Sequence, residues 1–335
     1  MWSEKSALIL REQGRPNSPG EHLQKPESRG ILFHVRTLFL FTYSDFKTMT
    51  IPQSVFAISA LLAPNSAKCV STFENEEARM AEHLLKRVPV MVAWLWFTCL
   101  AHNIANQSLP GASMEDAVNK PWRPIPARRI SAERARSWLL VIITLALGIS
   151  YVLDALLPLT LLLVFVWMYN DLDGSGINIW VRNALNMCGL MCFGWSALSV
   201  LAGGQQQLLP RTYAWLILTG IIVMTTVHAQ DLPDVEGDRL RGRKTMPLVY
   251  GERDARLSVT LAVCFWSVAG PSFWVNPMTA SGLVVCASPI VLGFTLGLLA
   301  MAEWGPWWDR RVLQLWCAWL LSIYASPLVA TWVKE

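Results

Sequence analysis

The chain has 335 residues, of which 53% are hydrophobic and 16% are charged, and its formal net charge is +4 at pH 7. This much apolar surface exceeds what one soluble core of that size would bury, which excludes an ordinary soluble globular protein and makes the lipid bilayer the expected surroundings. The seven cysteines include no CxxC pair and no Cys/His cluster, so neither a disulfide framework nor a zinc site is expected, and no nucleic-acid partner is expected either.

The N-terminal residues contain only a four-residue apolar stretch, which is too short for the apolar region of a secretory signal. We expect a disordered cytosolic tail over residues 1–35 and a single transmembrane domain over residues 36–335. A hydrocarbon core about 30 Å thick needs roughly 20 helical residues, and on this basis we expect nine transmembrane helices. Their predicted ranges are 48–64, 89–107, 137–153, 155–170, 178–201, 212–230, 256–274, 280–302 and 312–332.

The count of nine depends on one predicted break. Residues 137–170 would form a helix about 51 Å long at about 1.5 Å per residue, which is too long to cross the bilayer once. We therefore expect a break around Asp154 and Pro158. With nine spans, most Lys and Arg residues lie in loops on one side of the membrane, which predicts that these loops face the cytosol. The sequence favours an all-α, polytopic membrane protein, with the endoplasmic reticulum as one candidate location.

Two polar loops begin at the cytosolic ends of predicted spans. In the second loop, Asp231, Asp234 and Asp238 are spaced i, i+3, i+7, so on a continuous helix they project from one face toward a common point. Their mutual repulsion is tolerable if they face a divalent metal, and oxygen ligands of this kind suit Mg²⁺ bound together with substrate phosphates. Arg243 and Lys244 follow and can neutralise phosphate oxygens. A solvated acidic loop with basic partners is the alternative interpretation.

The first loop repeats this inventory of residue types. It carries, in chain order, Asn103, Asn106, Glu115, Asp116, Lys120 and Arg123. Two clusters of metal ligands and cations suit a diphosphate leaving group, because breaking an allylic C–O bond is helped when the charge that develops on the oxygen is neutralised. The allylic cation left behind needs aromatic faces. Candidates for that role, with core packing as the alternative for each, are Trp94, Trp96, Trp167 and Trp195.

These residues resemble the UbiA superfamily of intramembrane prenyltransferases, and the resemblance extends over roughly residues 40–332. The second family motif, D-x-x-D-x-x-G-D-x-x-x-G-x-x-T-L-P, is matched at every specified position but one. Its residues here are Asp231, Asp234, Gly237, Asp238, Gly242, Thr245 and Pro247, with Met246 in place of Leu. The resemblance implies nine transmembrane helices around a central cavity, two Asp-rich motifs at its cytosolic end, and Mg²⁺ as the cofactor.

The first family motif, N-D-x-x-D-x-x-x-D followed by R-T-x-x-R-P-L-P, is matched less well. Asn106 aligns with its Asn and Arg123 with its second Arg. The three Asp positions are occupied by Gln107, Pro110 and Met114. Because none of these can ionise, we expect Glu115 or Asp116 to supply the missing metal ligand together with Asn106. A helix cap or a solvated role for one of the acidic pair is the alternative.

The site implied by these motifs binds a prenyl diphosphate, with geranyl, farnesyl and geranylgeranyl diphosphate as candidate substrates. Its expected catalytic residues are Asn106, Asp116, Asp231, Asp234 and Asp238, with Glu115 as a further metal ligand. Its expected diphosphate-binding residues are Lys120, Arg123, Arg243 and Lys244. The active-site loops are therefore expected to face the cytosol.

The form of the first motif resembles a fungal branch of the superfamily associated with specialised terpenoid pathways. The superfamily includes aromatic prenyltransferases and membrane-bound class I terpene cyclases. We expect transfer of the prenyl group to an acceptor in terpenoid or meroterpenoid biosynthesis, with conversion to a cyclic terpene plus diphosphate as the alternative and a non-catalytic transporter as a more distant one. Polar candidates for a cavity niche that binds an aromatic acceptor are Asn103, Tyr169, Asn170, Asn183 and Asn186. Hydrogen bonding between helices is the alternative role for these side chains.

Overall fold

The computed structural model of the chain describes residues 30–71, 76–204, 207–302 and 304–334. It divides into two compact units, Met1–Arg36 and Thr37–Glu335. Of the predicted tail of residues 1–35, residues 1–29 lie outside the described residues. The site residues discussed below all belong to the second unit.

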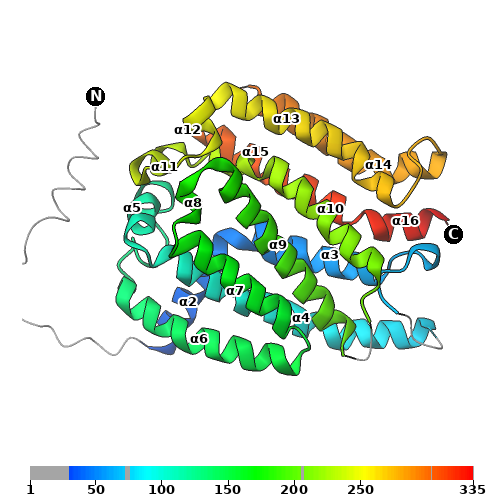
Figure 1. Ribbon diagram of the computed structural model, residues 1–335, viewed down its shortest axis with the longest axis horizontal. Coiled ribbons are helices and arrows are strands. Elements are labelled where there is room, and N and C mark those ends of the chain that lie inside the picture. The colour runs from blue at the N-terminus through cyan, green and yellow to red at the C-terminus, as the bar shows by residue number, and fades with distance from the viewer. Residues whose placement is uncertain (1–29, 72–75, 205–206, 303, 335) are drawn as a thin grey trace, which may run out of the picture. The chain divides into compact units, whose positions relative to one another are not determined.

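The described residues are predominantly helical, as the sequence predicts (Figure 1). The helices are α2 (Ile31–Thr42), α3 (Ile51–Leu61), α4 (Glu76–Gln107), α5 (Pro110–Asn119), α6 (Ala132–Val152), α7 (Leu156–Asn170), α8 (Gly174–Ile177), α9 (Ile179–Ala202), α10 (Pro210–Thr226), α11 (Val235–Arg241), α12 (Met246–Tyr250), α13 (Glu252–Ala269), α14 (Ala280–Ala300), α15 (Pro306–Tyr324) and α16 (Ser326–Lys334). Three short turns of other helical types also bear on the site. They are η1 (Tyr43–Asp45) and η4 (Val227–Asp231), which are 3-10 helical, and η2 (Phe46–Thr50), which is π-helical.

Candidate membrane spans are fewer than the sequence predicts. The helices that are long and apolar enough to cross a bilayer alone are Met80–Gln107, Ala132–Val152, Ile179–Ala202, Pro210–Asp231 and Ala280–Ala300. A sixth span results if α15 and the C-terminal helix, which meet at a bend of 47°, are counted together. Among the described residues, five or six candidate spans are therefore present, and the predicted nine are not confirmed.

Three of the predicted spans correspond to helices that are too short or too polar to count. The helix α3 has 11 residues and α7 has 15. At about 1.5 Å per residue, α7 extends only about 22 Å, less than the hydrocarbon thickness of about 30 Å. The helix α13 has 18 residues, but Glu252, Arg253, Asp254 and Arg256 lie in its first turns. Charged side chains are costly in hydrocarbon, so this end of α13 suits a membrane surface.

The predicted break between α6 and α7 is confirmed. The helix α6 ends at Val152 and α7 begins at Leu156. Asp154 lies between them with a left-handed backbone angle φ of 57°, a conformation that Asp tolerates better than most residues. Pro158 lies in the first turn of α7, where its missing N–H costs no helical hydrogen bond, so the chain reverses at Asp154.

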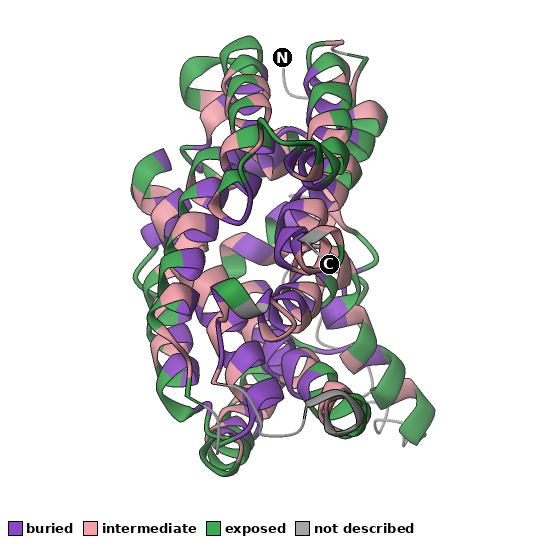
Figure 2. Cartoon of the chain, turned by 90° about the vertical axis from the view of Figure 1, so that its right-hand side faces the viewer, coloured by how far each residue is buried: buried purple, intermediate pink, exposed green. Residues whose placement is uncertain are grey.

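The helix α9 contacts α3, α4, α7 and α10 and lies between α7 and α10 in the ribbon (Figure 1). Its approach to α3 depends on Gly194, since a Cβ atom there would lie 2.8 Å from Gln53 Oε1 and 3.2 Å from the Phe56 ring. Small residues at helix contacts allow such close packing in membranes. Figure 2 shows that buried residues lie mostly toward the inside of the helical bundle and exposed residues mostly on its outer side and at its ends.

The outer faces of several helices are apolar. Leu140 of α6, Leu261 of α13 and Leu298 of α14 are 72%, 62% and 76% exposed. Exposed apolar surface of this kind suits contact with lipid rather than water. At one end of the helices, α5 packs against α11 (Figure 1). This contact brings the two polar loops of the sequence together.

Candidate active site

The segment that carries the second motif is not the continuous helix on which its spacing was interpreted. The helix α10 passes into η4, which ends at Asp231, and the chain turns before α11 begins at Val235. Pro233 lies in this turn and cannot donate the backbone hydrogen bond that would continue the helix. Asp231 therefore ends η4, Asp234 immediately precedes α11, and Asp238 lies within α11.

Each of the three carboxylates faces a different basic side chain. Arg182 Nη1 lies 2.5 Å from Asp231 Oδ1, and Lys120 Nζ lies 2.6 Å from Asp234 Oδ2. Arg243 Nη1 lies 3.3 Å from Asp238 Oδ1. Within the described ranges, no three His, Cys, Asp or Glu side chains are close enough to share a metal ion. The predicted convergence of these carboxylates on one point is not seen there.

Carboxylates of both loops nevertheless retain oxygen atoms suited to a cation. Over the part of the chain that is described, the Oδ2 atoms of Asp116, Asp231 and Asp238 are buried and accept no hydrogen bond. Burial raises the pKa of Asp238 to about 7, and the charges of Asp231 and Glu115 add to this while Arg182 and Arg243 oppose it. A bound cation would offset both the free-energy cost of burying these carboxylates and their mutual repulsion. Carboxylate oxygens of this kind fit Mg²⁺.

The acidic pair of the first loop lies buried in α5. Glu115 accepts from Arg241 and Arg243, each at 3.0 Å, so it links α5 to the segment that carries the second motif. Asp116 accepts from Arg123 at 2.7 Å. Burial raises the pKa of Asp116, and the nearby Arg123 opposes that rise. Neither residue caps a helix, because the residue at the N-terminal cap of α5 is Leu109.

The Asn119 side chain joins the two loops directly. Its Nδ2 donates to the Asp234 carbonyl at 3.1 Å, and its Oδ1 accepts from the Gly237 N–H at 3.2 Å. Gly242 ends α11 with a φ of 74°, a left-handed conformation that glycine adopts without strain. The second motif is thus held against the first by hydrogen bonds to its backbone.

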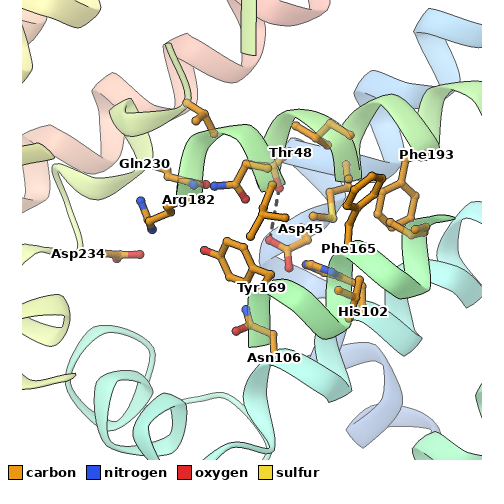
Figure 3. Close-up of a pocket in the computed structure, with 18 of the residues that line it drawn as sticks. Asp45, Thr48, His102, Asn106, Phe165, Tyr169, Arg182, Phe193, Gln230 and Asp234 are labelled. Atoms are coloured by element: carbon orange, nitrogen blue, oxygen red, sulfur yellow. Dashed lines mark hydrogen bonds between the residues drawn. The ribbon is translucent and has the colours of Figure 1, made fainter. Parts of the chain in front are cut away.

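A cavity opens beside these ion pairs and continues between the helices (Figure 3). The polar residues that line one end of it are Asn106, Glu115, Lys120, Arg123, Tyr169, Arg182, Asn186, Gln230, Asp234 and Arg243. Its apolar lining consists of Met49, Leu162, Phe165, Val166, Leu185, Leu190, Phe193, Val227 and Trp316. The cavity therefore has one end lined by four basic and two acidic side chains, called the basic end below, and one aromatic and aliphatic end.

Several predicted site residues lie elsewhere. Asn103 donates to the Cys99 carbonyl, Asn170 to the Val166 carbonyl and Asn183 to the Met224 carbonyl. The Asn183 bond joins α9 to α10 and is the hydrogen bonding between helices that the sequence left open, whereas the other two bonds lie within one helix. Lys244 is exposed and donates to the Ile177 carbonyl at 3.3 Å, so it does not line the cavity. Asp116, Asp231 and Asp238 lie behind the lining, paired with residues that form it.

The aromatic residues that line the cavity differ from the predicted ones. Trp94 is buried and donates to Ser150, Trp96 donates to Thr42, and Trp167 is 53% exposed. Trp195 lines a separate surface hollow near Tyr213. The aromatic lining instead consists of Phe165, Tyr169, Phe193 and Trp316. Tryptophan content alone could not distinguish the inner face of a helix from its other faces.

Polar lining residues were also missed. Asp45, Thr48 and His102 line the cavity beside its aromatic part, and Gln230 lines its basic end (Figure 3). A signal existed for His102 and for Arg182, because ionisable residues within predicted spans usually serve a function. Arg182 was noticeable only as part of a polar cluster, and its pairing with Asp231 requires the folded contact between α9 and η4.

Comparison with known proteins agrees with the motifs. The UbiA prenyltransferase family matches residues 77–316. The chain is 30% identical over 285 residues to diterpene cyclase eriG of Hericium erinaceus, which covers 83% of each chain. It is 29% identical to fumagillin beta-trans-bergamotene synthase af520 of Aspergillus fumigatus, over 76% of this chain and 80% of that one. It is 26% identical to polyprenyl transferase eriF of Hericium erinaceus, over 76% of this chain and 83% of that one.

Solved structures share the fold. A UbiA homolog from Archaeoglobus fulgidus bound to GPP and Mg²⁺ superposes with a TM-score of 0.59 at 13% identity, covering 88% of this chain and 99% of that one. A structure of digeranylgeranylglyceryl phosphate synthase superposes with a TM-score of 0.56 at 17% identity, covering 89% of this chain and 98% of that one. At these identities the likeness concerns the arrangement of the helices.

Proposed function

Since the chain belongs to the UbiA prenyltransferase family, we propose that it uses Mg²⁺ to ionise a prenyl diphosphate and cyclises the resulting allylic cation within its cavity. It is a multi-pass integral membrane enzyme that uses a prenyl diphosphate. The observation that carries the proposal is the cavity itself, which joins a basic end, bordered by paired carboxylates, to an aromatic end.

The basic end suits a diphosphate group. Lys120, Arg123, Arg182 and Arg243 all line it, and their N–H groups can donate charge-assisted hydrogen bonds to phosphate oxygens. Arg123 is 6% exposed and Arg182 is 4% exposed, so these charges act away from bulk water. Buried cations already paired with carboxylates are oriented before the substrate arrives, which lowers the cost of ordering them.

The carboxylates of the second motif are the candidate metal ligands. Because the three carboxylates do not meet at one point, Asp231, Asp234 and Asp238 would each contribute oxygen atoms to Mg²⁺ held mainly through the substrate phosphates, with Asn106 and Glu115 as further oxygen donors at the cavity wall. When bound, the ion neutralises negative charge that develops on the diphosphate as the C–O bond breaks. A structure at 13% identity that contains GPP and Mg²⁺ supports this choice of ion.

The aromatic end suits the prenyl chain. Phe165, Phe193 and Trp316 present ring faces or edges to the cavity, together with aliphatic side chains. Such a lining excludes the water that would otherwise trap the cation, and aromatic faces attract positive charge. The hydrocarbon chain can therefore fold there while the diphosphate stays at the basic end.

Two observations favour cyclisation over transfer, although transfer was the first expectation from sequence. Two of the three relatives named above are a diterpene cyclase and a bergamotene synthase, and the cyclase is similar over 83% of the chain. Asn103, Asn170 and Asn183, proposed for an acceptor niche, donate to backbone carbonyls in neighbouring turns or helices.

Transfer to an aromatic acceptor is the second candidate. It is supported by the 26% identity to polyprenyl transferase eriF and by Tyr169 and Asn186, which line the cavity. Membranes that contain the protein, incubated with Mg²⁺ and geranyl, farnesyl or geranylgeranyl diphosphate without an acceptor, separate the two. A cyclic terpene in the extract supports cyclisation. A product that forms only after a phenolic acceptor is added contradicts cyclisation and supports transfer.

A further inference from the structure

Asp45, Thr48 and His102 form a polar cluster on the cavity wall beside its aromatic part, and Arg123 of the diphosphate-binding end acts electrostatically on both Asp45 and His102 (Figure 3). Asp45 ends η1, Thr48 lies in the π-helical turn η2, and His102 lies in α4. The Thr48 hydroxyl donates to Asp45 Oδ1 at 3.3 Å. Figure 3 shows the Asp45 carboxylate directed toward the His102 imidazole, and the two side chains interact electrostatically.

The position of this cluster is unfavourable for a purely structural role. Placing a carboxylate and an imidazole beside an apolar cavity costs free energy unless their polar atoms are satisfied. Within the described part of the chain, His102 Nδ1 is buried and has no hydrogen-bond partner. The His102 ring lies edge-on to Phe193 with centroids 6.2 Å apart, and both residues line the cavity in which the prenyl chain is expected.

The cluster is also unsuited to the diphosphate. The negative charge of Asp45 would repel an anion, whereas it would stabilise a positive charge on His102 or on a nearby carbon. Arg123 is another charged group of the site that interacts electrostatically with both residues. Its guanidinium is already paired with Asp116 at 2.7 Å and donates to Ser44 at 3.1 Å.

We propose that His102, with Asp45 stabilising its protonated form, is the proton acceptor that ends the cyclisation; this rests on the function proposed above. Ionisation breaks the allylic C–O bond, and its electron pair leaves with the diphosphate. After ring closure, a C–H bond next to the cationic carbon breaks. Its electron pair forms the new C=C bond, and the proton moves to a His102 ring nitrogen, from which water or diphosphate later removes it.

The test compares diphosphate release with product identity in two variants, Asp45→Asn and His102→Gln. Asp171→Asn is the matched control, because Asp171 is on the surface, pairs with Arg136 and does not line the cavity. Both cavity variants should release diphosphate at rates within about threefold of the wild type, while the wild-type hydrocarbon falls by about tenfold or more. The missing product should appear as an alcohol or as a different alkene.

Three outcomes distinguish a failure of the proposed function from a failure of the inference alone. A wild-type protein that releases no diphosphate contradicts the proposed function and the inference together. Variants that release diphosphate and give the wild-type products in unchanged proportion contradict the inference alone. Loss of diphosphate release in Asp45→Asn, with His102→Gln unchanged, would identify Asp45 as a counter-ion of Arg123 and also contradict the inference.

Discussion

Asn119 lies against the backbone of Gly237, and the contact leaves no room for a side chain at residue 237. The Gly237 N–H donates to Asn119 Oδ1 at 3.2 Å, and a Cβ atom at residue 237 would collide with the Asn119 amide. This contact fixes α11 relative to α5 and therefore places Asp234 and Asp238 beside the cations of the first loop.

Gly237→Ala should separate the two loops and lower activity. Overpacking at a close contact typically costs about 1–3 kcal/mol, and here it would shift the second motif as a unit. An overpacking cost of this size predicts that diphosphate release falls by about tenfold or more. Gly148→Ala is the control, since no atom lies within 4 Å of a Cβ atom built there. Equal activity of the two variants, measured in the same membranes, would show that the contact is dispensable.

Asp234→Asn should remove Mg²⁺-dependent diphosphate release without removing the protein from the membrane. The substitution keeps the shape of the side chain but removes the charge that pairs with Lys120 at 2.6 Å and that would hold the metal. A metal contributes several kcal/mol to such a reaction, so a loss of roughly hundredfold is expected. Glu236→Gln, an exposed carboxylate two residues away, serves as the control. Wild-type turnover in the Asp234 variant would overturn the metal assignment.

Arg123→Ala should weaken binding of the prenyl diphosphate far more than Arg136→Ala. Arg123 is buried and lines the cavity, whereas Arg136 is exposed and pairs at 3.3 Å with Asp171 on the surface. A hydrogen bond to a charged group contributes about 1.5–3 kcal/mol, which predicts that KM rises by roughly tenfold or more. An exposed pair contributes about 1 kcal/mol or less to stability and should leave KM nearly unchanged. Steady-state kinetics that give equal KM values for the two variants would refute this ranking.

Phe165→Leu should change the fate of the cation rather than the rate at which it forms. Phe165 lines the aromatic end of the cavity, and an aromatic face stabilises a cation by about 0.5–2 kcal/mol. Without it, more of the cation should be captured by water, so the ratio of alcohol to hydrocarbon rises. Phe265→Leu, at a 61% exposed position on α13, should leave that ratio unchanged. Chromatography that gives identical ratios would argue against a role for the ring.

The sequence predicted the helices better than it predicted their membrane crossings. Every predicted span overlaps a helix, although 312–332 covers parts of both α15 and α16, and the reversal at Asp154 follows from a length argument alone. The count of nine was not confirmed, because α3 and α7 are short and α13 begins with charged residues. Helix length and burial depend on how neighbours such as α9 cover these segments, which the spacing of apolar residues does not specify.

The residues of the site were likewise predicted better than their arrangement. The motif match identified Arg123 and Asp234, and the basic residues of the two loops added Lys120 and Arg243; all four line one cavity. It could not predict that Pro233 interrupts the helix between the carboxylates, since a spacing of i, i+3, i+7 presumes a helix without interruption.

The cavity residues missed from sequence share a different cause. Asp45 and His102 come from segments far apart in the chain, and although His102 stood out as an ionisable residue within a predicted span, nothing linked it to Asp45. Folding α4 beside η2, which directly follows Asp45, places them on the same wall. A single sequence contains no signal for such a pair, whereas a motif concentrates its residues in one stretch.

The most direct test of the account is to measure diphosphate released by membranes that contain the protein, with each prenyl diphosphate in turn, in Mg²⁺ and again in excess EDTA. The account predicts release with at least one of the three substrates in Mg²⁺, none above background in EDTA, and roughly hundredfold less in Mg²⁺ from membranes that carry Asp234→Asn. Release that continues in EDTA, or no release from any substrate in Mg²⁺, would contradict it.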